Sequence, residues 1–199
     1  MPHDFEALTD EQLVERSRAG DMVAFEELVS RFETRIYRFA LHSCRRPEDA
    51  AEITQDTFVR AWRAFDRFDG SRTLAPWLFA IARRLCIDHH RRRPEPTEVL
   101  SEQPEIAAEP GAEVAHDGES DVSWNCARSV LSPNQFHALW LRYAEDMDVV
   151  GIARALGLTR THVKVLLFRA RKSLARQLSP HAGHNPKSYE NLAEHFCRI

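Results

Sequence analysis

Basic and aromatic side chains concentrate in two stretches of the sequence, and both stretches have the chemistry of a nucleic-acid-binding surface. Residues 53–93 end in a cluster of positive charge that includes Arg83, Arg84 and the run 91–93. Residues 160–178 contain further cations at Arg160, His162, Lys164, Arg169, Arg171, Lys172 and Arg176. Cations neutralise phosphates, and aromatic rings stack on bases that have left the duplex. Binding to a polyanion is therefore the first expectation.

The second stretch has the pattern of a helix-turn-helix. Apolar residues predict a helix over 148–156, the pair Gly157-Leu158 predicts a tight turn, and Thr159 is placed to cap a helix over 160–178. The start of such a second helix enters the major groove of DNA. We expect Arg160, Thr161 and Lys164 to reach base edges and the later cations to reach phosphates. A solvated cationic helix face is the alternative interpretation.

The first stretch places an apolar stripe opposite its cations. Leu74, Trp77, Leu78, Ile81, Ala82 and Leu85 recur at helical spacing and predict a buried face. Phe79, Arg83, Arg84 and His90 fall on the other face, which predicts a surface for nucleic acid together with the loop 66–73. The alternative for the last three arginines is an ordinary polar helix end.

Other chemistry has weaker support in the residues. Cys86, His89 and His90 have the spacing of neighbours on one helix face, and His42 with Cys44 and His195 with Cys197 form further pairs. None of these sets supplies four zinc ligands at a known spacing, and Cys86 also continues the apolar stripe, which predicts a buried thiol. The sequence has no glycine-rich phosphate loop and no nucleophile elbow. We therefore expect no enzyme activity, no metal and no cofactor.

The charge of the chain is segregated along its 199 residues. The net charge is −3, but nine acidic residues and no Lys or Arg lie between Pro94 and Asn125. Such asymmetry predicts basic modules joined by an acidic connector. No apolar run has the length of a membrane span, and the first residues lack the apolar core of a signal peptide. These features predict a cytoplasmic protein without a membrane span.

Helix signals recur along the chain and predict an all-α fold. Thr9 and Gln12 form a capping box, Asp21 caps a helix that ends near Cys44, and Pro47 opens a third helix. A second helical unit begins near Val122 and contains the capping box Ser132-Pro-Asn-Gln135. We predict a helical bundle over 1–93, a flexible acidic linker over 94–121, a helix-turn-helix domain over 122–178 and a tail over 179–199.

The third helix is predicted to divide into an apolar and a polar side. Ala51, Thr54, Phe58, Ala61, Trp62 and Phe65 make up the apolar side. Asp49, Glu52, Asp56, Arg60 and Arg63 make up the polar side.

An ordered set of motifs resembles one known family. The segments Phe25-Glu-Glu-Leu-Val, Gln55-Asp-Thr-Phe-Val-Arg-Ala-Trp62, Trp77-Leu-Phe-Ala-Ile-Ala-Arg-Arg-Leu and Asp88-His-His-Arg-Arg-Arg93 resemble region 2 of an extracytoplasmic-function sigma factor of bacterial RNA polymerase. The segments Ser132-Pro-Asn-Gln, Ile152-Ala-Arg-Ala-Leu-Gly-Leu and Phe168-Arg-Ala-Arg-Lys resemble region 4. The resemblance covers about residues 22–178. One departure is Val165-Leu166, where family members commonly have Ser-Arg.

The resemblance implies a non-catalytic protein that binds core RNA polymerase and promoter DNA and is held inactive by an anti-sigma protein. It implies polymerase contacts through Asp49, Glu52, Gln55, Asp56 and Arg60. It implies that Phe68, Ser71, Arg72, Trp77, Arg83 and Arg84 bind the minus-ten element. It implies that Arg160, Thr161, Lys164, Phe168, Arg169 and Arg171 bind the minus-thirty-five element.

Two other functions remain open at this stage. A helix-turn-helix regulator that acts without polymerase predicts tight, salt-dependent binding to duplex DNA by the protein alone. A metal- or redox-responsive interaction protein predicts a response that depends on residues such as Cys126 and Cys197.

Overall fold

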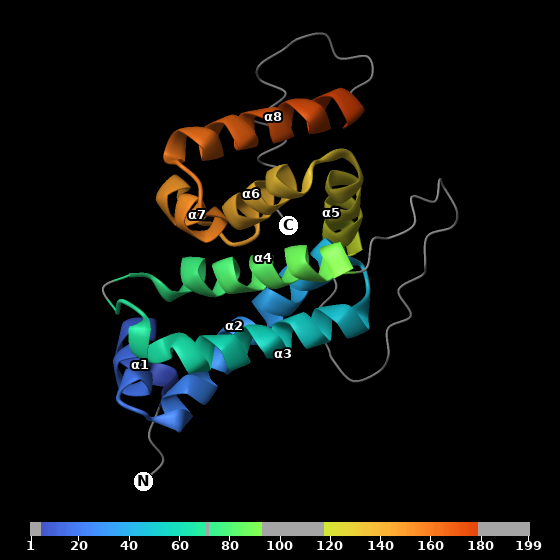
Figure 1. Cartoon of the computed structure of the whole chain (residues 1–199). Helices are drawn as coiled ribbons and strands as arrows, with labels where there is room; N and C mark the ends of the chain where they lie inside the picture. Colours follow the sequence, from blue (N-terminus) through green and yellow to red (C-terminus); the bar gives the residue numbers. More distant parts are fainter. Residues whose placement is uncertain (1–4, 71, 93–117, 179–199) are drawn as a thin grey trace.

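The computed structural model describes residues 5–70, 72–92 and 118–178, and throughout these ranges the regular structure is helical (Figure 1). The all-α prediction is therefore confirmed. Among the described residues, no helix combines the length and the apolar content needed to cross a bilayer. The predicted linker core, Ser71 and the tail with its His195 and Cys197 lie outside the described residues.

Four helices build the first unit: α1 (Asp10–Arg18), α2 (Met22–Cys44), α3 (Pro47–Ala64) and α4 (Leu74–Arg92). Their starts follow the caps expected from the sequence. The Thr9 hydroxyl accepts a hydrogen bond from the backbone N–H of Gln12, whose side chain accepts one in return from the Thr9 N–H. The Asp21 carboxylate accepts from the N–H groups of Val23 and Ala24. Such caps satisfy the donors that a helix start leaves unpaired.

The second unit contains α5 (Gly118–Val130), α6 (Pro133–Tyr143), α7 (Val149–Leu156) and α8 (Arg160–Leu178). The first of these helices begins at Gly118, before the predicted start near Val122. Gly157 has a left-handed backbone with φ of 65° and makes the turn between α7 and α8. Glycine adopts this conformation without the steric cost that a side chain would add. The predicted helix-turn-helix is therefore confirmed in its geometry.

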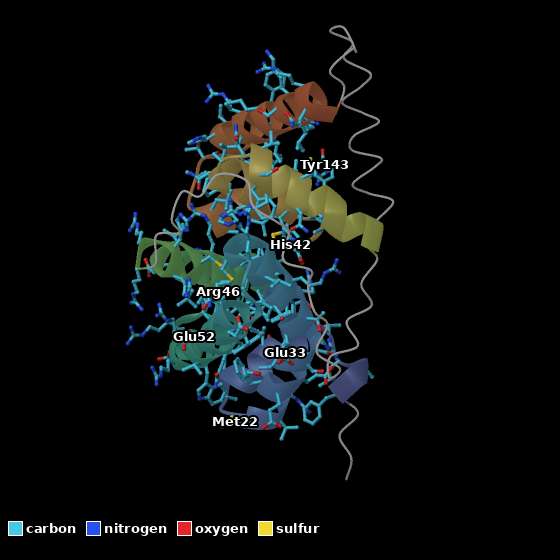
Figure 2. The ribbon with its side chains drawn as sticks, turned by 90° about the vertical axis from the view of Figure 1, so that its right-hand side faces the viewer. Met22, Glu33, His42, Arg46, Glu52 and Tyr143 are labelled. Carbon is cyan, nitrogen blue, oxygen red and sulfur yellow. The ribbon has the colours of Figure 1, made fainter. Side chains whose placement is uncertain are left out.

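The two units pack directly against each other. Helix α4 lies against α2 and α3 on one side and against α7 on the other, and α8 lies on the far side of the second unit (Figure 1). In the side view of Figure 2, His42 marks the place where α2 meets the second unit, and Met22 lies at the opposite end of the same helix. The buried residues of both units form one continuous cluster. The sequence had predicted two units but not this contact.

Two side-chain predictions are wrong because of how the helices of the first unit pack. Phe79 was expected on an exposed face, but it is 0% exposed and packs edge to face against Phe39, with 5.3 Å between ring centroids. In the first turn of α3 the buried positions are Asp49 and Ala50, whereas Ala51, predicted on the apolar side, is exposed. Phe79 is buried because α4 is covered on two sides, and Asp49 is buried because the first turn of α3 faces α4.

Candidate nucleic-acid interface

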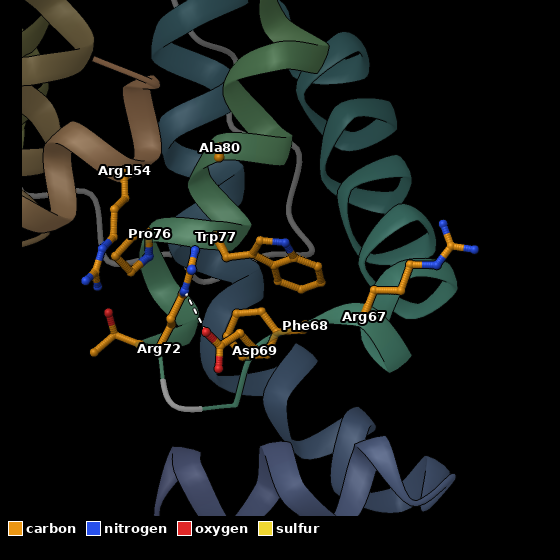
Figure 3. Close-up of a pocket in the computed structure, with 9 residues that line it drawn as sticks. Arg67, Phe68, Asp69, Arg72, Pro76, Trp77, Ala80 and Arg154 are labelled. Atoms are coloured by element: carbon orange, nitrogen blue, oxygen red, sulfur yellow. Dashed lines mark hydrogen bonds and ion pairs between the residues drawn. The ribbon is translucent and has the colours of Figure 1, made fainter. Parts of the chain in front are cut away.

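A pocket of about 320 Å³ lies where the turn before α4 meets the start of that helix (Figure 3). Phe68 and Trp77 form its aromatic wall, with 4.7 Å between their ring centroids. Arg72 is held at the rim, because its Nε donates to the Asp69 carboxylate at 2.8 Å. The complete lining is Arg67, Phe68, Asp69, Arg72, Thr73, Pro76, Trp77, Ala80 and Arg154. The structure thus brings Phe68, Arg72 and Trp77 together. The sequence had predicted one surface formed by the loop 66–73 and the helix that follows it.

The mix of groups in this pocket suits a planar, partly polar ligand. Aromatic rings offer faces for stacking, and the cations at the rim offer donors to phosphate or base oxygens. Aromatic residues buried in a wall also lose little entropy when they contact a ligand, since their rotamers are already fixed. The pocket is therefore suited to hold a base that has left its stack.

Arg154 is the lining residue that the sequence did not reveal. It comes from α7 in the second unit, whereas the other lining residues belong to the first unit. Figure 3 shows its side chain entering from the ribbon of the second unit, beside Pro76. No local sequence signal predicts such a residue, because its position depends on how two separate units pack.

The two arginines of α4 differ in their surroundings. Arg84 is exposed, as predicted for a residue that meets a ligand. Arg83 is half-buried, and its guanidinium donates to the Asn134 side-chain oxygen at 2.8 Å, across the junction between the units. Burial, followed by the charge of Arg84, lowers the pKa of Arg83. The Nε of Arg83 is buried without a hydrogen-bond partner, so the contact with Asn134 leaves one buried donor unpaired.

The outward face of α8 collects the cations predicted for the groove. Arg160, Thr161, Lys164, Phe168 and Arg169 are exposed. Arg171 is half-buried, and its Nε donates to the Leu167 carbonyl at 3.3 Å. The Thr159 hydroxyl caps the helix start by accepting from the N–H of His162 at 3.2 Å. This helix contains no acidic residue, so its outward potential is positive along its length.

The polar side of α3 is exposed at Glu52, Gln55 and Arg60, with Asp56 half-buried next to Arg60. Asp49 differs, since it is only 6% exposed. Its carboxylate lies 3.3 Å from the His89 ring nitrogen of α4 and 3.7 Å from the Arg46 guanidinium. Asp49 therefore ties α3 to α4, a role that the sequence did not indicate.

Besides the packing of α4 against α7, side chains of α2 contribute to the junction between the units. Phe39 of that helix contacts His137 and Trp140 of α6, and the Ser43 hydroxyl lies 3.2 Å from the His137 Nε2. Arg35 forms an ion pair of 2.7 Å with Glu145, whose side chain is 4% exposed. The mixture of rings, an ion pair and hydrogen bonds resembles the composition of a protein interface that can separate.

Cysteine and histidine side chains do not gather into a metal site in the part of the chain that the structure describes. Cys86 is buried, as the apolar stripe predicted, and burial raises the pKa of its thiol to about 12. A thiol with so high a pKa is a poor metal ligand and a poor nucleophile at neutral pH. His89, the next member of the proposed set, is engaged with Asp49.

Comparisons with known proteins agree with this architecture. The sequence family described as sigma-70 region 2 matches residues 28–94, and the family described as sigma-70 region 4 matches residues 126–174. The ECF RNA polymerase sigma factor BldN of Streptomyces coelicolor is 30% identical over 172 residues, with 84% of this chain and 65% of that protein covered. The ECF RNA polymerase sigma factor SigW of Bacillus subtilis is 26% identical over 179 residues, with coverage of 83% and 94%.

Solved structures share the fold. The structure of CnrH in complex with the cytosolic domain of CnrY has a TM-score of 0.67 at 24% identity and covers 87% of this chain and 99% of that chain. The sigma factor RpoE from Bartonella quintana, in complex with the anti-sigma factor NepR, has a TM-score of 0.61 at 23% identity and covers 79% and 98%.

Proposed function

The chain belongs to the extracytoplasmic-function sigma factors, and from this premise we propose that it binds core RNA polymerase and directs it to a specific set of promoters. It recognises promoter DNA, contributes to opening it, and catalyses no reaction itself. The observation that carries this proposal is the order of the two matched regions, one with an aromatic pocket beside cations and the other with a basic helix-turn-helix. Its place of action is the bacterial cytoplasm, where the polymerase works.

The exposed side of α3 is the proposed polymerase contact. Glu52, Gln55 and Arg60 project outward, and Asp56 lies beside Arg60 at 3.9 Å. They would dock on the helices of the polymerase clamp. Asp49 supports this face from beneath through His89, so its contribution is to hold α3 in place.

The pocket is the proposed site for a base of the minus-ten element. Flipping a base out of the duplex costs a few kcal/mol, and stacking on an aromatic ring returns about 1–3 kcal/mol per base. Phe68 and Trp77 would supply that stacking, while Arg72 and Arg84 contact the displaced strand. Arg83 would join them once it has left Asn134.

The packed arrangement is proposed to be a closed state. The minus-ten and minus-thirty-five elements are about 25 base pairs apart, which is about 85 Å of duplex. A folded chain of this size has a radius of gyration of about 16 Å. The two units therefore cannot stay in contact while each binds its own element, and Arg154 must leave the pocket. An anti-sigma protein that holds the units together would keep the factor inactive.

Transcription from purified components tests the main proposal. The full-length chain is mixed with core polymerase and genomic fragments, and the 5′ ends of the transcripts are mapped. The expected result is a defined set of start sites that appears only when both proteins are present. A regulator acting without polymerase would instead bind the same DNA tightly by itself. The redox alternative predicts a response to metal or to thiol oxidation. Loss of that response after substitution of Cys126 and Cys197 by serine would favour this alternative.

The cations of α8 lead to a first quantitative prediction. Replacing Lys164 or Arg169 by alanine is expected to weaken binding to the upstream element by about 1–3 kcal/mol each if the residue contacts a base, because a charge-assisted contact is lost. Fluorescence anisotropy of the polymerase-bound factor on labelled promoter DNA measures the loss. Arg18→Ala removes the same charge from an exposed site on α1 and serves as the control. Equal losses in all three variants would contradict the assignment.

A further inference from the structure

Two large apolar side chains are exposed on the helix that faces the DNA groove. Val165 is 38% exposed and Phe168 is 57% exposed. Val163, Leu166, Leu167 and Leu174 of the same helix are buried against the second unit. The exposed pair therefore lies on the outward face, three residues apart, which is one helical turn. This arrangement exposes apolar surface that the fold itself does not use.

The surroundings of the pair indicate what covers it. Lys164 and Arg169 are exposed immediately beside Val165 and Phe168, and α8 contains no acidic residue. The partner is therefore a polyanion that also presents small apolar groups. The Gly157 turn and the Thr159 cap place α8 as the second helix of a helix-turn-helix, which favours duplex DNA over an acidic membrane surface.

The major groove presents one apolar group on its base edges, the 5-methyl group of thymine. An isopropyl group and a phenyl ring cannot donate or accept the hydrogen bonds that distinguish the other base edges. Residues three apart on a helix are separated by about 4.5 Å along its axis, and successive base pairs by about 3.4 Å. The two side chains can therefore meet the methyl groups of neighbouring base pairs.

We propose that Val165 and Phe168 select thymine at neighbouring positions of the upstream promoter element through its 5-methyl groups. This inference rests on the proposed function, since it assigns part of the specificity of the same helix. Lys164 and Arg169 supply affinity through charge, and the apolar pair supplies the sequence preference between them. The occupant of this face is thus duplex DNA with thymine at these positions.

Replacing thymine by deoxyuridine tests the proposal, because it removes the methyl group and leaves base pairing unchanged. The promoters come from the mapped start sites, and binding is measured with the full-length chain in complex with core polymerase. At one or two thymines of the upstream element, deoxyuridine is expected to weaken binding about three- to fivefold per methyl group. The Val165→Ser variant should bind the thymine and deoxyuridine promoters equally at its position. Val23→Ser, which changes an exposed valine on α2, should keep the native preference.

The possible results test the thymine inference and the proposed function separately. Promoter-specific transcription with equal affinity for thymine and deoxyuridine at every position would overturn the inference and leave the proposed function standing. A thymine preference that persists in both Val165→Ser and Phe168→Ala would also overturn it, and would point to a protein partner on the apolar pair. A failure of the native chain to bind any promoter with core polymerase would instead overturn the proposed function.

Discussion

Replacing Trp140 by alanine is expected to lower the free energy of unfolding by about 3–5 kcal/mol, the loss typical of a deleted large aromatic side chain in a core. Trp140 is 1% exposed and touches rings from two other helices, α2 and α5. Its ring centroid lies 4.7 Å from Trp124, 4.8 Å from His42 and 6.4 Å from Phe39. Because two of these residues belong to α2, the substitution removes contacts within the second unit and between the units.

The Trp140→Ala variant also leaves a buried acid with fewer donors. The indole Nε1 donates to the Glu145 carboxylate at 3.3 Å, and burial already raises the pKa of that group. Chemical denaturation followed by circular dichroism measures the loss of stability. Trp62→Ala is the matched control, since Trp62 is half-buried in the first unit against Phe25. If the two variants lost equal stability, Trp140 would not have the central position described.

Acidification from pH 7.5 to pH 5 is expected to shift the equilibrium between the units toward separation, and the titration of His137 alone contributes about 30-fold, or about 2 kcal/mol. The cause is His137, which is buried at the junction. Burial, reinforced by the charges of Arg83 and Arg128, lowers its pKa from 6.5 to about 3. Its Nδ1 has no hydrogen-bond partner, so the neutral ring is held without full compensation.

The direction follows from proton binding in the two states. When the units separate, His137 meets water and its pKa returns toward 6.5, so the separated state binds a proton between pH 6.5 and pH 3 while the packed state does not. The stabilising contribution of the packed state is fully present above pH 6.5 and is lost progressively below it. The expected shift depends little on the lower pKa, because pH 5 lies well above it.

Glu145 opposes this effect and makes the net shift smaller than the contribution of His137. Burial raises its pKa from 4.5, although Arg35 opposes that shift, so protonation of Glu145 favours the packed state as the pH falls. Small-angle scattering across the pH range measures the separation as an increase in the radius of gyration. The His137→Phe variant keeps an aromatic ring at the junction and should not separate on acidification. Equal expansion of this variant and the native chain would exclude His137 as the cause.

Both predictions concern the same junction between the units. The contacts at this junction are the physical basis of the proposed closed state. The junction combines ring contacts at Phe39 and Trp140 with charged contacts at Arg35 and Arg83 that each have a cost of desolvation. A contact of this kind holds two units together without making their separation prohibitive. That balance agrees with the proposed closed state, in which residues of both units line the pocket.

Local sequence determined the helices and the family. The ends of the helices follow Thr9, Asp21, Asp148 and Thr159, because a cap depends on groups within three residues of one another. The order of the motifs was sufficient to identify a sigma factor with regions 2 and 4, because each motif lies within one or two helices. The roles of individual site residues in binding polymerase and promoter remain predictions.

Only the tertiary structure determined which side of each helix is covered. Phe79 is buried because α4 is packed between two layers. Asp49 is buried because α4, which carries its partner His89, covers the start of α3. Arg83 contacts Asn134, and Arg154 reaches a pocket in the other unit, although each pair of elements is far apart in the chain. A helical pattern reports how apolar residues are spaced along one element. It does not report which other element will cover them, since that depends on the packing of the whole chain.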